Sequence, residues 1–493
     1  MWTKKRLLVF WLLLAFQVIF LLAFVFLRYV DVDEGFYLEA AYLVKNGKLP
    51  YLDFFYIQMP YLPYAYSLTS DFGFSSLFFG RLISAAASLL LGLLLFWLAY
   101  KLSGDAKISL LVFFLYGFHG LTLTWHSTVK TSTFSDLWGF FSLFFFISYL
   151  CSKGGRSRNL MLFFSGIFIG LALNFRLTHM ILLIPASLLI FLLPPLENIR
   201  KRISNFAFLL FGVILSSSFA IYLFLRDPHI FVFDNLIFRQ IWGFKVVQMN
   251  LLTRLYTLSK FLFYPQDLPI LILATLSLVY LFRRLKRKHE ISLEDRATIV
   301  ALSFAFSIII LSFLVSPTQF QYFAQALSFL LIACIPALRR WKSRWENKRI
   351  VIPLGTLYLL SMLPFVLIFI FGIREKDKQF TLKNLKKVVE VIEKNSRPEE
   401  RILTFTPLYV VLSKREPMPG LEAWGGEVAP LLTEKQMRDC KLINLEEIKK
   451  MIREAEVNLI AAEEWILPGS DSSLWAKYQL LEKISGVQIY KKK

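Results

Sequence analysis

Long apolar stretches recur along the first three quarters of this chain, and a cluster of lysine and arginine follows every second stretch. A helix that crosses a bilayer needs about 20 mainly apolar residues. With 56% hydrophobic and 16% aromatic residues, the 493-residue chain cannot enclose its apolar surface in a soluble globule. The sequence therefore predicts an α-helical polytopic membrane protein.

The apolar stretches predict about eleven transmembrane helices, with the basic loops on the cytoplasmic side. The spans lie near 7–27, 76–98, 108–124, 134–150, 159–174, 180–195, 203–225, 267–282, 297–315, 320–338 and 350–372. This pattern places the N-terminus inside and the C-terminus outside, in a prokaryotic plasma membrane by default. Because the net charge of +21 falls mainly in short loops, we expect it to orient the chain in the membrane, and nucleic acid is not an expected partner.

Acidic residues concentrate in the predicted outer segments, whereas the inner loops are short and basic. Two outer loops, 28–75 and 226–266, are long and aromatic enough to lie along the membrane surface. Carboxylates are costly near a bilayer and are usually kept there for chemistry, ion passage or an interfacial cap. The pair Asp33-Glu34, just after the first span, therefore predicts a site at the outer membrane face.

The first outer loop predicts short elements. Apolar residues at helical spacing favour a helix over 34–44, with Asp33 as its N-cap and Gly47 as its C-cap. The three prolines of segment 49–64 interrupt any further helix, and its tyrosines offer both rings and hydroxyls. This segment suits a groove for a sugar or a lipid headgroup.

The order of motifs in this loop resembles a known family. Asp33-Glu34 is followed by a tyrosine, an Ala-Ala pair, the sequence Gly-Lys-Leu-Pro-Tyr-Leu-Asp ending at Asp53, then further proline and tyrosine, and Arg81 near the start of the second span. This order is similar to the integral-membrane GT-C glycosyltransferases, in particular the group of protein O-mannosyltransferases and aminoarabinose transferases. The resemblance implies a polyprenyl-phosphate sugar as donor and a catalytic role for Asp33, with Glu34 as its neighbour.

An inverting transfer from such a donor needs a carboxylate that takes a proton from the acceptor hydroxyl, and cations beside the departing phosphate. Asp33 is the predicted base. The predicted phosphate-binding cations are Arg81, Lys130, Arg176 and Arg239, and the predicted substrate contacts are Asp53, Tyr56, Gln58, Tyr61, Gln321 and Tyr322. Gln321 and Tyr322 belong to a glutamine-rich segment that stands where related enzymes often have Arg-Tyr or His-Tyr.

Each of these residues also has a structural interpretation. Asp33 would act as a helix cap alone, and Arg81 or Arg176 would reach from a helix end toward the interface. His119, His126 and His179 are more often hydrogen-bonded interfacial histidines than zinc ligands. The three cysteines lie far apart and indicate neither a disulfide framework nor a thiolate metal site. No cofactor is expected, and a divalent metal is optional.

The composition becomes charged and water-compatible after residue 372, which divides the chain into a membrane domain, 1–372, and an outer α/β domain, 373–493. Alternation of apolar and polar residues predicts two helices and three strands in the second domain. They are expected at 380–395, 401–405, 444–454, 457–461 and 487–490. The loop around Trp424 has the turn residues of a contact loop, which suggests acceptor binding or a cap over the site.

The sequence therefore predicts a glycosyltransferase that moves a hexosyl or pentosyl group from a polyprenyl-phosphate donor to a lipid, protein or glycan acceptor. A flippase of lipid-linked sugars is a rival, although transporters usually place ionisable residues near mid-membrane. A glycan ligase or polymerase, or a non-catalytic scaffold, is also compatible with the sequence.

Overall fold

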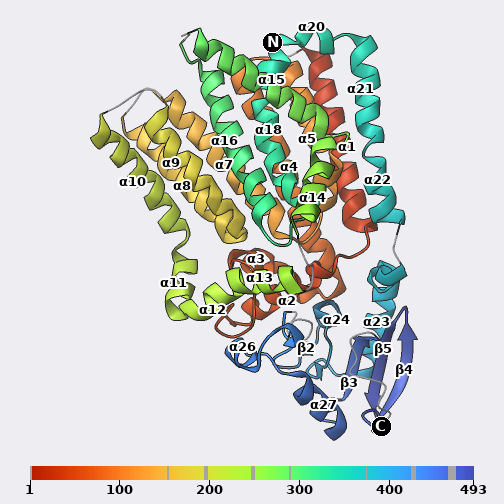
Figure 1. Cartoon of the computed structure of the whole chain (residues 1–493). Coiled ribbons are helices and arrows are strands. Elements are labelled where there is room, and N and C mark those ends of the chain that lie inside the picture. The colour runs from red at the N-terminus through yellow and green to blue at the C-terminus, as the bar shows by residue number, and fades with distance from the viewer. Residues whose placement is uncertain are drawn as a thin grey trace.

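The computed structural model confirms the predicted fold class, a bundle of membrane helices with a small α/β region at its C-terminal end (Figure 1). It describes residues 3–152, 155–193, 198–245, 250–287, 290–372, 375–423, 429–464 and 473–493. The predicted domain boundary at residue 373 and the predicted contact residue Trp424 lie outside these ranges, so the division into two domains remains a prediction.

Among the described residues, seven helices are long and apolar enough to cross a membrane. They are α1 (Lys4–Leu27), α4 (Phe74–Ser103), α7 (Thr131–Cys151), α8 (Arg156–Phe175), α15 (Asp267–Lys286), α16 (Leu293–Leu314) and the run Lys348–Phe371, which joins α21 (Lys348–Leu360), α22 (Leu363–Val366) and η5 (Leu367–Phe371). A bent pair, α10 (Ile199–Ser216) and α11 (Ser218–Arg226), turns by 62° at its break. Length and hydropathy therefore support seven or eight spans, and the number eleven is not confirmed.

Shorter apolar helices occupy the other predicted spans. They are α5 (Ala106–Gly117), the η2–α9 run (Leu177–Leu182 and Leu183–Leu192) and the segment of α17 (Phe320–Phe323), η4 (Ala324–Ala326) and α18 (Leu327–Ala333). Small helices cap or connect these elements: α6 (Gly120–Trp125), α19 (Ile335–Arg340) and α20 (Lys342–Trp345).

Two long connections contribute to the side of the bundle that carries the C-terminal region, opposite the N-terminus; the last helix of the second connection, α14, lies alongside the bundle itself (Figure 1). The connection from α1 to α4 forms α2 (Val32–Lys45), α3 (Tyr61–Tyr66) and η1 (Ser67–Phe72). The connection from α11 to α15 forms α12 (Pro228–Val232), η3 (Phe233–Ile237), α13 (Phe238–Lys245) and α14 (Leu251–Phe263). In Figure 1, α2, α3 and α13 lie between the bundle and the C-terminal strands.

The predicted helix after the first span is confirmed as α2, but two details of the prediction are wrong. Asp31, and not Asp33, is the N-cap, because its carboxylate accepts the Asp33 N–H at 3.1 Å. This leaves the Asp33 carboxylate in the first turn without a capping role. The prolines do not exclude helix either: Pro63 lies in the first turn of α3, where its missing N–H removes no helical hydrogen bond.

The C-terminal region combines helices with a small mixed set of strands. Its helices are η6 (Glu375–Phe380), α23 (Leu382–Asn395), α24 (Pro407–Ser413), η7 (Ala429–Leu431), α26 (Glu434–Asp439) and α27 (Leu445–Glu454). Its strands are β1 (Arg401–Ile402), β2 (Glu416–Pro417), β3 (Leu459–Glu463), β4 (Tyr478–Ile484) and β5 (Val487–Lys492). β5 lies between β3 and β4 in an antiparallel sheet, and β1 pairs with β2 in parallel. The predicted helices and strands are all present, although β1 is shorter than predicted, whereas α24, α26, β2, β4 and the 3-10 helices η6 and η7 were not predicted.

The C-terminal region packs directly on α2. A Cβ atom at Gly35 would lie 2.7 Å from both the Cβ and the backbone nitrogen of Leu408 in α24, so only glycine permits this approach. Four residues further along α2, the buried Glu39 carboxylate accepts the Ala423 N–H at 2.8 Å. Burial raises the pKa of Glu39 to about 8. The helix that carries Asp33 is therefore held between the bundle and the C-terminal region.

Helices α8 and α10 also approach each other through glycines. A Cβ atom at Gly166 would clash with the Leu209 carbonyl oxygen, and one at Gly212 would clash with the Phe163 carbonyl oxygen. Close backbone contact of this kind replaces the hydrophobic effect as a source of helix association in lipid. The position of α8 matters for the site, because Arg176 follows its last residue.

We predict that Gly166→Ala lowers the stability of the protein by about 1–3 kcal/mol, because the added methyl group forces α8 and α10 apart. Thermal unfolding in detergent, followed by tryptophan fluorescence, measures this change. Gly355→Ala is the matched control, since nothing lies within 4 Å of a Cβ atom there. Equal melting temperatures for the two variants would contradict the proposed close packing.

Candidate active site

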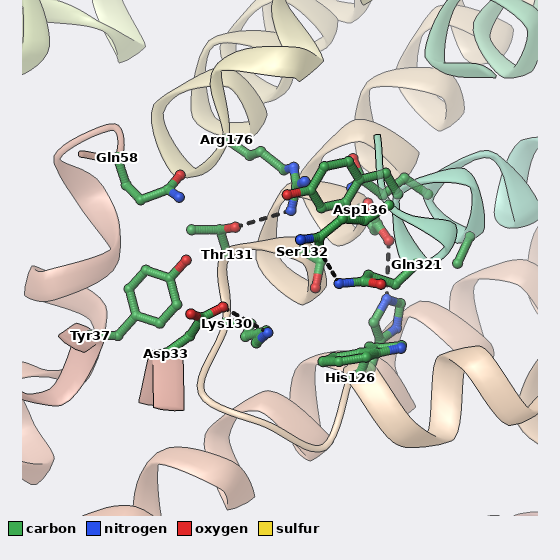
Figure 2. Close-up of a pocket in the computed structure, with 15 residues that line it drawn as sticks. Asp33, Tyr37, Gln58, His126, Lys130, Thr131, Ser132, Asp136, Arg176 and Gln321 are labelled. Atoms are coloured by element: carbon green, nitrogen blue, oxygen red, sulfur yellow. Dashed lines mark hydrogen bonds and ion pairs between the residues drawn. The ribbon is translucent and has the colours of Figure 1, made fainter. Parts of the chain in front are cut away.

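An enclosed polar pocket lies where α2, the start of α7 and the end of α8 meet (Figure 2). Figure 2 shows Asp33, Tyr37 and Gln58 facing Thr131 and Arg176 across it. The pocket brings together six of the predicted site residues: Asp33, Gln58, Lys130, Arg176, Gln321 and Tyr322. It also contains residues that were not predicted to bind substrate: Tyr37, Trp125, His126, Thr131, Ser132, Asp136, Gln319, Ala324 and Gln325.

Asp33 stands at the end of a chain of alternating charges. The Lys130 ammonium lies 2.8 Å from Asp33 Oδ2 and 3.1 Å from Asp31 Oδ1, and Arg28 Nη2 lies 3.6 Å from Asp31 Oδ2. The indole of Trp125 adds cation–π contacts, 4.4 Å from Lys130 and 4.7 Å from Arg28. Each charge therefore has an opposite neighbour, as groups at a membrane boundary require.

The two carboxylates differ in proton affinity. Burial raises the pKa of Asp33 above its usual value, although the Lys130 charge opposes the shift. Burial acts on Asp31 in the same way, but the charges of Lys130 and Arg28 outweigh it and lower the pKa of Asp31. Paired carboxyl groups with diverging pKa values are typical of sites that move protons. Asp33 is the more basic of the two and is also the one that lines the pocket.

Arg81 holds the chain that leads into α2. It is fully buried and forms an ion pair with Glu34, with Nη2 2.8 Å from Oε2 and Nε 2.9 Å from the same oxygen. Nη1 donates to the carbonyls of Val25 and Arg28 at 2.9 and 3.1 Å, at the end of α1. Neither Arg81 nor Glu34 lines the pocket. The pair thus joins α4 to the start of α2 outside the pocket, and its phosphate-binding and catalytic roles remain predictions.

Arg176 is the second cation of the pocket. Its Cζ atom lies 4.3 Å from the centre of the Tyr322 ring, and its Nη1 donates to Thr131 Oγ1 at 3.4 Å. Arg239 lies close by in α13 and donates to the Ile57 carbonyl at 3.2 Å, next to Gln58. It lies outside the pocket lining but contributes positive charge to Asp33. Arg176, at the end of α8, and Arg239, in α13, thus both lie near the Asp33 side of the pocket.

Three predicted substrate contacts do not line the pocket. Asp53 accepts the Leu49 N–H at 2.7 Å and fixes a turn. Tyr56 is fully buried, with its ring 5.1 Å from that of Phe36. Tyr61 donates to the Ser216 carbonyl at 2.6 Å, which ties α3 to α10. These residues shape the loop, and a direct role in binding is not supported by their positions.

A buried cluster of one acid and two histidines forms part of the pocket wall. His126 Nε2 lies 3.0 Å from Asp136 Oδ2, and His179 Nε2 lies 3.3 Å from Asp136 Oδ1. His119, at the other end of α6, instead binds Asp267 at 3.0 Å, so the predicted histidines do not form one group. Within the described ranges, no three histidine, cysteine or acidic residues are arranged to hold a metal ion.

Sequence signals existed for some of the residues that were missed. Tyr37 stands four positions after Asp33 and shares its helical face. Asp136 is an acid within an apolar span, which marks a functional position by default. Trp125, by contrast, is one of many interfacial aromatic residues in the sequence, and only its place between Arg28 and Lys130 sets it apart.

Comparison with solved structures identifies the fold. The chain superimposes on the aminoarabinose transferase ArnT from Cupriavidus metallidurans with a TM-score of 0.68, covering 97% of both chains at 11% identity. The protein has the GT-C glycosyltransferase fold. A second structure of that ArnT contains undecaprenyl phosphate and gives a TM-score of 0.65 over 97% of both chains at 12% identity.

A further GT-C structure, the oligosaccharyltransferase from Archaeoglobus fulgidus in a complex with zinc and sulfate, gives a TM-score of 0.51 at 13% identity. The match covers 97% of the present chain and 73% of the archaeal one. No protein-family model and no curated protein sequence matches this chain. The similarity to the GT-C enzymes is therefore visible in the fold and not in the overall sequence.

We predict that Arg81→Met destabilises the protein by about 3–5 kcal/mol, because it leaves the Glu34 carboxylate buried without a partner. The fraction that elutes as a monodisperse species in detergent, together with its melting temperature, measures the loss. The double variant Arg81→Met/Glu34→Leu removes both charges and is expected to recover part of the stability. Normal folding of Arg81→Met with a selective loss of donor binding would instead support the phosphate-binding role.

Proposed function

We propose that this protein is a glycosyltransferase that moves a sugar from a polyprenyl-phosphate donor to an acceptor hydroxyl at the membrane surface. The observation that carries the proposal is the pocket that unites the Asp33 carboxylate with Lys130 and Arg176 at one end of the helical bundle. The GT-C fold and the undecaprenyl phosphate bound to the similar ArnT support it.

In this reaction the acceptor oxygen attacks the anomeric carbon from the face opposite the phosphate, so that the configuration inverts. The bond between that carbon and the phosphate oxygen breaks, and the phosphate leaves with the bonding electrons. Asp33 takes the proton of the acceptor hydroxyl, which is a contribution of about 10²–10⁴-fold to the rate. Its raised pKa favours this role, since a stronger base accepts the proton more readily.

The negative charge that develops on the leaving phosphate needs fixed positive partners. Arg176 lines the pocket and Arg239 lies beside Gln58 at its edge, so these two guanidinium groups are the proposed phosphate ligands. Lys130 already binds two carboxylates and is assigned to holding Asp33 in place. The stacking of Tyr322 on Arg176 fixes the guanidinium plane toward the pocket.

The proposed orientation places the pocket and the C-terminal region on the extracytoplasmic side of the plasma membrane, with the N-terminus in the cytoplasm. The basic clusters around Lys107, Arg339 and Lys342 lie together near the opposite end, where they pair with Glu346, Glu294 and Asp105. Positive residues at cytoplasmic loops are the usual determinant of topology. The acceptor, a lipid, protein or glycan, would then reach the pocket from the extracytoplasmic side.

We predict that Asp33→Asn lowers sugar transfer by about 10²–10⁴-fold without loss of folding, because Asn fills the same space but cannot take the proton. Purified protein in lipid nanodiscs is supplied with a set of radiolabelled polyprenyl-phosphate sugars, and donor consumption is measured. Asp227→Asn is the matched control, since Asp227 caps α12 through the Ile230 N–H at 3.0 Å and lies outside the pocket.

Equal turnover by Asp33→Asn and the wild type would remove the carboxylate from the mechanism. If no donor is consumed but the labelled lipid crosses the bilayer of a proteoliposome, a flippase function replaces the transferase.

We also predict that Arg176→Gln raises the KM for the donor by about tenfold or more, because a charge-assisted bond to phosphate is lost. The melting temperature is expected to stay near that of the wild type, since Arg176 has no carboxylate partner among the described residues and is held by a long hydrogen bond of 3.4 Å to Thr131 and by its contact with the Tyr322 ring. An unchanged KM would assign the phosphate to Arg239 alone.

A further inference from the structure

Two carboxylates at the start of α2 share one ammonium group. Lys130 Nζ lies 2.8 Å from Asp33 Oδ2 and 3.1 Å from Asp31 Oδ1. A lysine ammonium has three donors and binds both oxygens at once. Lys130 comes from the segment before α7, so the shared contact also joins the first connection to the bundle.

The two carboxylates are not equivalent. Asp31 has a second cation, Arg28, at 3.6 Å, and it accepts the Asp33 backbone N–H at 3.1 Å. The Asp33 side chain is 29% exposed and lines the pocket, whereas that of Asp31 is 16% exposed and does not. Asp31 is therefore placed to stay ionised, and Asp33 is placed to exchange a proton.

The charged groups around the pair come from several elements. The charges of Lys130 and of Arg239 in α13 lower the pKa of Asp33, whereas the charge of Asp31 raises it. The Asp33 carboxylate in turn raises the pKa of Tyr37 in α2. The charges of Lys130 and Arg28 lower the pKa of Asp31, and the Asp31 carboxylate raises the pKa of Glu34. Without the anion at Asp31, its repulsion would no longer oppose the attraction between Lys130 and the Asp33 carboxylate. An opposite charge that close makes a carboxylate a weaker base.

We propose that Asp31 is a positioning residue: it binds the same Lys130 ammonium as Asp33 and, as a neighbouring anion, keeps the Asp33 carboxylate able to take the proton of the acceptor. This inference rests on the proposed transferase function and assigns a residue that acts through Lys130 and Asp33 without touching substrate. It also explains why α2 begins with acidic groups two positions apart, one as its N-cap and one in the pocket.

The test uses Asp31→Asn, which removes the charge but keeps an oxygen for the helix cap. Loss of the nearby anion lowers the pKa of Asp33, so Asp33 becomes deprotonated at a lower pH. The acid limb of the pH profile of kcat is expected to move to lower pH by about one unit. The plateau is expected to fall as well, because a weaker base transfers the proton less efficiently.

Two control variants separate charge from general damage. Asp31→Glu restores the anion and is expected to return the acid limb toward its position in the wild type. Asp227→Asn removes an acidic charge from the second connection and is expected to leave the limb unmoved, since Asp227 caps α12 and does not contact Lys130 in any described interaction.

A second measurement reads the proton on Asp33 without any donor. Infrared difference spectra of the full-length protein at a series of pH values give the protonated carboxyl band of Asp33, assigned by its absence in Asp33→Asn. The midpoint of this band is expected at lower pH in Asp31→Asn than in the wild type. An unmoved midpoint would overturn the inference, whereas failure of the proposed function would show as absent donor turnover in the wild type.

Discussion

The buried contact between Arg81 and Glu34 is the interaction on which the site depends. Arg81 projects from α4, binds the Glu34 carboxylate and also donates to carbonyls at the end of α1. Those carbonyls have no partners within their own helix, and a buried arginine supplies enough donors for all of them. One side chain thus fixes both the end of the first span and the start of α2, which sets where Asp31 and Asp33 point.

The proposed role of Asp33 as a base at the membrane surface places conflicting demands on its carboxylate. It must be shielded enough from water to be a useful base, yet a buried charge without a partner is costly. The alternating arrangement of Arg28, Asp31, Lys130 and Asp33 meets both demands. Of the two carboxylates in this arrangement, only Asp33 lines the pocket. Asp31 is therefore paired with cations away from the pocket, whereas Asp33 can also meet a bound substrate.

The C-terminal region contributes to the same geometry from the opposite side of α2. Gly35 allows α24 to approach the helix backbone, and Glu39 receives the Ala423 N–H. Ala423 stands 384 positions after Glu39 in the sequence. The C-terminal region therefore supports α2 and does not simply follow the membrane helices as an appended unit.

The sequence alone determined the membrane class, the GT-C resemblance, the helix after the first span and a pocket residue, Asp33, because these follow from hydropathy, charge order and a local motif. It did not distinguish Asp31 from Asp33 as the cap, and it did not show that Glu34 and Arg81 pair with each other outside the pocket, because the residue types alone do not reveal which side chains meet. Lys130 and Arg176 were among several candidate cations of similar appearance. Only the tertiary structure brought them to Asp33, since long-range packing of α2, α7 and α8 decides which charges meet and which are buried away from the pocket.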